Sequence, residues 1–196
     1  SPAGMNLAQR DGAAAARLFD DLTADSNGVP PEQLVNVIAT GWANQDPAAA
    51  ADWAMRRASE PQRDLAIRNV VGMWAAQDAD GARQWTLRLP QGAVRDAALA
   101  AALTASAMQR AGNLDTGLLN AFASPQAQQQ TVLQIVQQFA YTDPTKARAI
   151  ADAHLDATFR ARADGIIEAA RNQPRFGVQG VEVGGIQGAA PAVRGR

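Results

Sequence analysis

An internal repeat of 32 residues is the feature of this sequence that most limits how the chain can fold. Residues 42–47 read Trp-Ala-Asn-Gln-Asp-Pro, and residues 74–79 read Trp-Ala-Ala-Gln-Asp-Ala. A second tryptophan follows eleven residues after the first in both copies, at Trp53 and Trp85. A fixed interval of this length is typical of proteins in which one supersecondary unit stacks on the next. We therefore expect a row of similar units that share one continuous core.

Weaker copies extend the repeat towards both ends of the chain. Residues 139–144 read Phe-Ala-Tyr-Thr-Asp-Pro and lie about three periods after the first copy. We expect a degraded copy between them, within residues 107–119, with Asp115 near its turn. A partial copy is expected within residues 8–12. The repeat is thus predicted to cover most of the chain.

The aspartates of the repeat suit the starts of helices. Asp46 and Asp143 stand where an N-cap is expected, because a carboxylate there accepts from the free amides of the next turn and contributes about 1 kcal/mol. The proline after each of them fits the first helical position, where a missing N–H costs nothing. The same proline disfavours helix at the residue before it. One helix therefore ends and the next begins with almost no loop, which makes neighbouring helices antiparallel.

Composition and apolar spacing indicate helix over the same region. Alanine, the best helix former, is abundant, while the β-branched and aromatic residues that favour strands are sparse. Apolar residues recur at helical spacing within residues 67–74 and 132–139. We predict helices at 12–24, 31–43, 46–58, 61–76, 78–89, 92–110, 114–122, 125–141, 143–156 and 158–172. The predicted fold class of residues 1–174 is all-α, with tandem antiparallel helix hairpins that form an α-solenoid, a superhelical array.

The sequence changes character after Pro174. Residues 175–196 are rich in glycine and valine and are predicted to form a non-helical tail. Because a terminal repeat leaves an apolar stacking face, we expect residues 176–187 to pack near Ile166 and Ile167, or into the groove of a neighbouring molecule. The second arrangement would make the protein self-associate. A flexible terminus is the alternative.

The junction at residues 46–53, Asp-Pro-Ala-Ala-Ala-Ala-Asp-Trp, resembles the inter-repeat junction of tetratricopeptide repeats. That family joins its helix pairs with Asp-Pro, an alanine three residues after the proline and a large aromatic residue six after it. Here those positions are Ala50 and Trp53. The sequence departs from the family at Arg57, where the family has a small residue, and its period is about 32 rather than 34. The resemblance covers a few junctions and implies a superhelical array with a peptide-binding concave face.

Few residues in the sequence suit catalysis or metal binding. The chain has no cysteine and one histidine, His154, which lies on an apolar helical stripe and is interpreted as a packed core residue. One histidine without cysteine cannot form the usual structural zinc site. Neither the nucleophile elbow of serine hydrolases nor a phosphate-binding loop occurs. We therefore expect a protein that is not an enzyme and that holds no metal or cofactor, with a carboxylate-dependent hydrolase as an alternative.

The charges of the chain point to a protein or peptide as its partner. The chain has 18 basic and 19 acidic residues, whereas nucleic-acid-binding proteins usually have a basic excess. No apolar run reaches the roughly 18 residues of a membrane span. Arg56 and Arg88 recur at the repeat interval, and Arg57 and Arg83 lie close to them in the sequence. These four arginines are either solvated surface paired with neighbouring aspartates or a site that binds acidic side chains or a carboxylate.

The recurring tryptophans also allow two interpretations. The indoles could form an aromatic cage for a ligand, but their regular recurrence favours a hydrophobic joint between successive units. The predicted function is a scaffold or adaptor that binds a protein or peptide on one face of the array. The alternative is the non-catalytic helical domain of a larger bacterial envelope enzyme or regulator. The compartment stays open between the bacterial periplasm or cell envelope and the cytoplasm.

Overall fold

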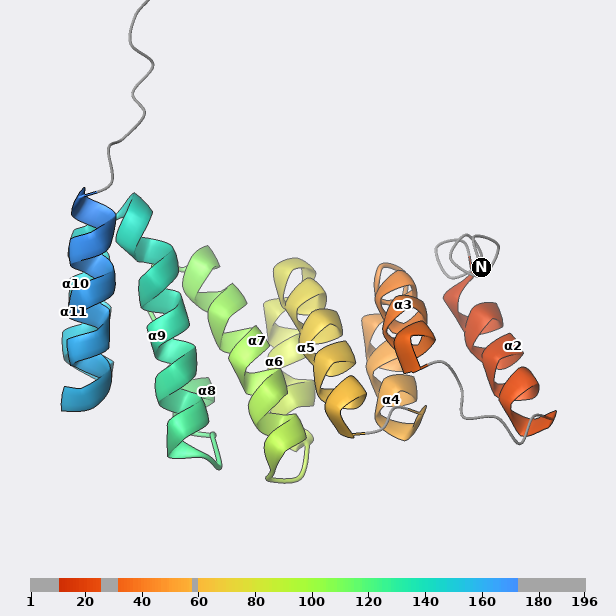
Figure 1. The fold of residues 1–196 in the computed structure, drawn as a ribbon. Coiled ribbons are helices and arrows are strands. Elements are labelled where there is room, and N and C mark those ends of the chain that lie inside the picture. The colour runs from red at the N-terminus through yellow and green to blue at the C-terminus, as the bar shows by residue number, and fades with distance from the viewer. Residues whose placement is uncertain (1–10, 26–31, 58–59, 173–196) are drawn as a thin grey trace, which may run out of the picture.

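The structure, a computed structural model, describes residues 11–25, 32–57 and 60–172. Regular secondary structure in these residues is entirely α-helical, which confirms the predicted all-α class. The helices, labelled as in Figure 1, are α2 (Gly12–Asp25), α3 (Glu32–Ala43), α4 (Pro47–Arg57), α5 (Glu60–Gln77), α6 (Ala79–Arg88), α7 (Ala93–Gln109), α8 (Thr116–Leu119), α9 (Pro125–Thr142), α10 (Pro144–His154) and α11 (Ala157–Asn172). Their boundaries lie within two residues of the predicted ones, except that the helix predicted at 114–122 is the single turn α8.

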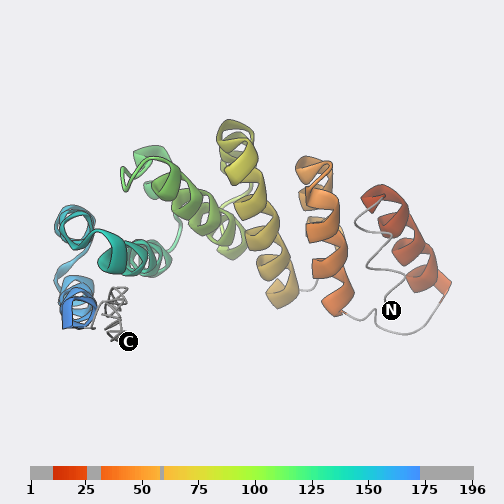
Figure 2. The ribbon, with the colours of Figure 1, turned by 90° about the horizontal axis from the view of Figure 1, so that it is seen from above.

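The helices follow one another across the molecule in chain order (Figure 1). Helix α3 packs on both α4 and α5, α5 packs on α6 and α7, and α9 packs on α10 and α11. The helices α4, α6 and α8 lie behind α3, α5, α7 and α9 in the view of Figure 1. Seen from above, the row of helices curves, so that one side of the row is concave (Figure 2). The front helices α5, α7 and α9 are the ones that matter for the site described below.

Six of the described helices begin with an aspartate that caps them in the same way. In each, a side-chain oxygen accepts a hydrogen bond from the backbone amide three residues further on. The pairs are Asp11 with Ala14 (2.9 Å), Asp46 with Ala49 (3.0 Å), Asp78 with Gly81 (3.0 Å), Asp115 with Leu118 (3.1 Å), Asp143 with Lys146 (3.0 Å) and Asp156 with Phe159 (2.9 Å). The weak copies predicted within residues 8–12 and 107–119 therefore do carry the cap of the repeat.

The tryptophans form the joint between successive units. Trp53 and Trp85 are both buried, and the ring centroid of each lies 6.5 or 6.2 Å from that of the preceding tryptophan, Trp42 or Trp74. In both copies, one indole hydrogen bond links the unit to the one before it. Trp53 Nε1 donates to Asp20 Oδ1 at 3.4 Å, and Trp85 Nε1 donates to Asp52 Oδ1 at 2.9 Å. The prediction that the tryptophans belong to the core is confirmed for Trp53, Trp74 and Trp85, while Trp42 is partly buried and packs against that core.

The next unit replaces the tryptophan joint with an ion pair. Gly117 lies one repeat after Trp85, within the single turn of α8. The guanidinium of Arg83 lies so close to Gly117 that a side chain there would collide with it. Arg83 Nε donates to Asp115 Oδ2 at 3.0 Å, and the arginine and aspartate side chains are 38% and 17% exposed. The same aspartate that caps α8 thus also ties it to α6.

Acid is expected to weaken this polar joint. Burial of the Asp115 carboxyl raises its pKa, but the amide of Leu118 and the hydrogen bond and charge of Arg83 outweigh that effect and hold the pKa below its ordinary value of 3.8. A lowered pKa in the folded state means that the stabilisation is complete above the unfolded-state pKa and is lost as pH falls through the folded-state pKa. We expect Asp115→Asn to cost about 1 kcal/mol at pH 7, with the difference from the unchanged protein shrinking below about pH 4. Urea unfolding of both proteins from pH 7 to pH 2.5 measures this difference in stability. A difference that does not depend on pH would contradict a stabilising role for the ionised Asp115 carboxylate.

The last described helix of the row is α11. Its Ile167 is already buried and Ile166 is half-buried. The prediction that residues 176–187 cover this end concerns residues outside the described part of the chain. Among the described helices, none combines the length and apolar character needed to cross a bilayer.

Candidate functional site

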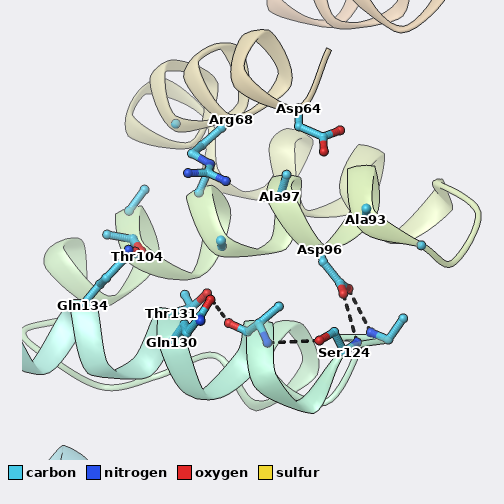
Figure 3. A pocket seen from close by; sticks show the side chains of 17 residues that line it. Asp64, Arg68, Ala93, Asp96, Ala97, Thr104, Ser124, Gln130, Thr131 and Gln134 are labelled. Carbon is cyan, nitrogen blue, oxygen red and sulfur yellow. Dashed lines mark hydrogen bonds between the residues drawn. The ribbon is translucent and has the colours of Figure 1, made fainter. Parts of the chain in front are cut away.

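A groove of about 840 Å³ runs along α7, with α5 and α9 as its two walls (Figure 3). The floor is a stripe of small side chains that recur along one face of α7. They are Ala93, Ala97, Ala100, Ala101 and Ala105. The stripe is about 18 Å long at 1.5 Å per helical residue, which matches five or six residues of extended chain. The volume lies within the range of ligand-binding clefts, about 300–1,000 Å³.

The α9 wall carries amide groups along its edge. Gln130 and Gln134 line the groove, are exposed and lie one helical turn apart. Each glutamine amide offers both hydrogen-bond donors and an acceptor. Thr131 lies between them, but its hydroxyl donates to the backbone oxygen of Ala127 at 2.8 Å. The glutamines are therefore the groups on this wall best placed to pair with the backbone of a bound chain.

A buried carboxylate fixes the α9 wall to the floor. Asp96, in the first turn of α7, is 7% exposed. Its two oxygens accept from the backbone amides of Ala123 at 2.8 Å and Ser124 at 2.9 Å, just before α9 begins (Figure 3). The Ser124 hydroxyl in turn caps α9 by accepting from the amide of Ala127 at 3.2 Å. Asp96 is therefore a positioning residue, with both oxygens already engaged.

The α5 wall contributes a carboxylate and a guanidinium one turn apart. Asp64 and Arg68 both line the groove, and Arg68 is exposed. Asp64 Oδ1 is buried and has no hydrogen-bond partner among the described residues. A buried acceptor without a partner costs free energy, so a donor that enters the groove would be stabilised there. Of the two aspartates that line the groove, Asp96 therefore has both oxygens engaged, whereas Asp64 has an oxygen available to a bound donor.

Gly72 leaves the α5 wall low one helical turn beyond Arg68. It lies within α5, where glycine costs up to about 1 kcal/mol relative to alanine. A Cβ atom placed on Gly72 would meet nothing within 4 Å, so packing inside this chain does not require the glycine. The absence of a side chain at Gly72 therefore leaves space in the groove for a bound molecule.

The four arginines predicted as a binding site lie on α4 and α6, and none of them lines the groove. Arg57 Nε pairs with Asp20 Oδ1 at 2.9 Å, and Arg83 pairs with Asp115 as described above. These two arginines thus connect successive units. Arg56 and Arg88 are both exposed. Binding of an acidic segment by this set stays a prediction, which now concerns mainly Arg56 and Arg88.

His154, the only histidine of the chain, ends α10 and is half-buried. Burial lowers its pKa below the ordinary value. Its backbone oxygen accepts from Gln129 Nε2 at 3.0 Å, which ties α10 to α9. Within the described residues, no three His, Asp or Glu side chains gather closely enough to hold a metal ion.

The groove was not predicted from the sequence. Residues 97–102 read Ala-Ala-Leu-Ala-Ala-Ala, which indicates a helix but not what lies beside it. The only available signal was the glycine at position 72 within a helical pattern. Comparison with known proteins finds no matching protein-family model, no similar curated protein and no similar solved structure.

Proposed function

We propose that this protein binds a polypeptide segment, in extended form, in the groove along α7. The observation that carries the proposal is the groove's cross-section: a floor of alanines and a wall lowered at Gly72. Such a slot leaves room for a polypeptide backbone. An extended chain would offer its amides to Gln130 and Gln134 on one wall and an N–H donor to Asp64 on the other.

The proposal includes the architecture that creates the groove. We propose that the helices form an α-solenoid of antiparallel hairpins, similar to tetratricopeptide repeats, with the groove on the concave side. The order of helix contacts and the curvature in Figure 2 support this arrangement. Stacked repeats produce extended binding surfaces of this kind. The protein would act as a scaffold or adaptor, and the same groove would serve it as the helical domain of a larger bacterial envelope enzyme or regulator.

Filling the slot at Gly72 is expected to weaken peptide binding. Peptides selected from a random display library on the unchanged protein serve as probes, and fluorescence anisotropy measures their affinity. Gly72→Met places a side chain in the groove and should weaken binding by about tenfold or more, as overpacking of 1–3 kcal/mol implies. The matched control is Gly165→Met, because Gly165 lies in α11, away from the groove, and also has open space around its Cβ position.

Both substitutions remove a glycine from a helix, so both proteins should be slightly more stable than the unchanged one. A loss of binding confined to Gly72→Met therefore cannot come from unfolding. Equal binding by the two variants would contradict the proposal. The double reversal Arg56→Glu with Arg88→Glu, assayed with the same peptides, separates the groove from the arginine surface: loss of binding there would move the site to α4 and α6.

A further inference from the structure

We infer that the groove's own occupant is the glycine- and valine-rich segment 176–187 of the same chain. This inference rests on the proposed function and names the class of segment that the groove takes. Residues 176–187 read Phe-Gly-Val-Gln-Gly-Val-Glu-Val-Gly-Gly-Ile-Gln and lie outside the described part of the chain.

The segment can turn apolar side chains towards the floor. In an extended chain, alternate side chains point to the same side. Val181, Val183 and Gly185 fall on one side of such a chain, while Glu182 falls on the other. The alanine floor is an apolar surface, and the open space at Gly72 leaves room beside it. The side with the two valines and the glycine thus matches the apolar character of the floor.

The start of the segment lies within reach of the groove. Helix α11 ends at Asn172 and packs against α9, which is one wall of the groove, and the last turns of both helices lie at the same end of the molecule (Figure 1). Going from the end of α9 back to Gln134 covers about 12 Å at 1.5 Å per residue, and adjacent helix axes lie about 8–10 Å apart. Residues 173–178 can span about 20 Å when extended. The following residues can therefore run along the floor from the Gln134 end.

Charge complementarity places Glu182 beside the α5 wall. Glu182 is the only acidic residue in residues 173–196, and Arg68 is the only arginine lining the groove. Arg68 is exposed and lies one turn from Gly72, near the middle of that wall. With the valines on the floor, Glu182 points out of the groove towards this rim. Its carboxylate and the Arg68 guanidinium are then free to pair.

Disulfide trapping in the full chain tests the inference, and the natural absence of cysteine makes the result easy to interpret. Ala101→Cys with Val183→Cys joins the floor to the segment, and Gly165→Cys with Val183→Cys is the control. Gly165 is much closer to Val183 in sequence, so an unbound tail would link faster to the control. We expect the floor pair to form its disulfide about tenfold faster, within one molecule, because binding raises the local concentration. Equal or slower linkage of the floor pair, or disulfide-linked dimers, would overturn the inference.

Exchanging the two charges gives a second, independent measurement. Arg68→Glu should slow trapping by about threefold, as loss of an exposed ion pair implies, and adding Glu182→Arg should restore the rate. The matched control, Arg88→Glu, changes an exposed arginine outside the groove and should leave the rate unchanged. If Glu182→Arg fails to restore the rate that Arg68→Glu lowers, Arg68 and Glu182 do not pair. The proposed position of the segment along the groove is then wrong.

The outcomes distinguish this inference from the proposed function. If the floor pair shows no preference while library-selected peptides still bind in a Gly72-dependent way, the segment is not the occupant and the peptide-binding function stands. If the trapped, disulfide-linked protein no longer binds those peptides, segment and peptide share the groove, as both proposals require. If no peptide binds and no trapping is favoured, both are wrong.

Discussion

Replacing Trp85 with alanine is expected to lower the free energy of unfolding by about 3–5 kcal/mol. The side chain is 6% exposed, its ring lies 6.2 Å from that of Trp74, and its indole N–H donates to Asp52 in the preceding unit. Alanine would remove the packing across the joint and leave a cavity in it. Urea unfolding followed by circular dichroism measures the loss.

Two further substitutions show where the loss comes from. Trp85→Phe keeps most of the buried ring but removes the indole N–H, so it should cost less than the alanine change. Tyr141→Ala removes an aromatic side chain that is 52% exposed and should cost no more than about 0.5 kcal/mol. If Trp85→Ala were no more harmful than Tyr141→Ala, the tryptophan would not be the joint between units.

The second large effect is expected at Asp96, where alanine should cost about 3 kcal/mol. A single carboxylate there satisfies the amides of both Ala123 and Ser124, and hydrogen bonds to charged groups contribute about 1.5–3 kcal/mol each. Alanine would leave both amides without their partner and detach the start of α9 from α7. Thermal and urea unfolding measure the stability, and hydrogen exchange of the two amides reports the local opening.

The matched control for Asp96 is an ordinary cap of the repeat. Asp46 also accepts a hydrogen bond from a backbone amide, but it is exposed and its partner, Ala49, lies in the same helix. Asp46→Ala should therefore cost about 1 kcal/mol. Equal losses at Asp46 and Asp96 would mean that Asp96 is only a cap and does not position the groove wall.

The helices and their starts could be predicted because the signals are local. The carboxylate of Asp46 or Asp143 acts on an amide three residues away, and the following proline fixes the same boundary. The repeat then identified the weaker cap at Asp115. Its helix α8 was predicted too long: only Thr116–Leu119 is helical, and the Arg83 side chain that lies against Gly117 comes from the preceding unit.

The groove and its fixing carboxylate could not be predicted because they depend on contacts between distant residues. Asp96 stands 27 and 28 residues before the amides that it binds, and no pattern within α7 indicates them. In the sequence, the alanines of the floor indicate only a helix. They form the floor of a groove because α5 and α9 pack on either side of α7. The sequence likewise left the four arginines open between paired surface residues and a binding site, because the partner of Arg83 is an aspartate 32 residues further along the chain.

The proposed binding groove is tested most directly by the ratio of one peptide's affinities for two variants. A single library-selected peptide is titrated against Gly72→Met and against Gly165→Met under identical conditions. A groove that holds an extended chain over Gly72 predicts a Kd at least about tenfold weaker for Gly72→Met. A ratio near one would show that the peptide binds elsewhere and would contradict the assignment of the groove along α7 as the functional site.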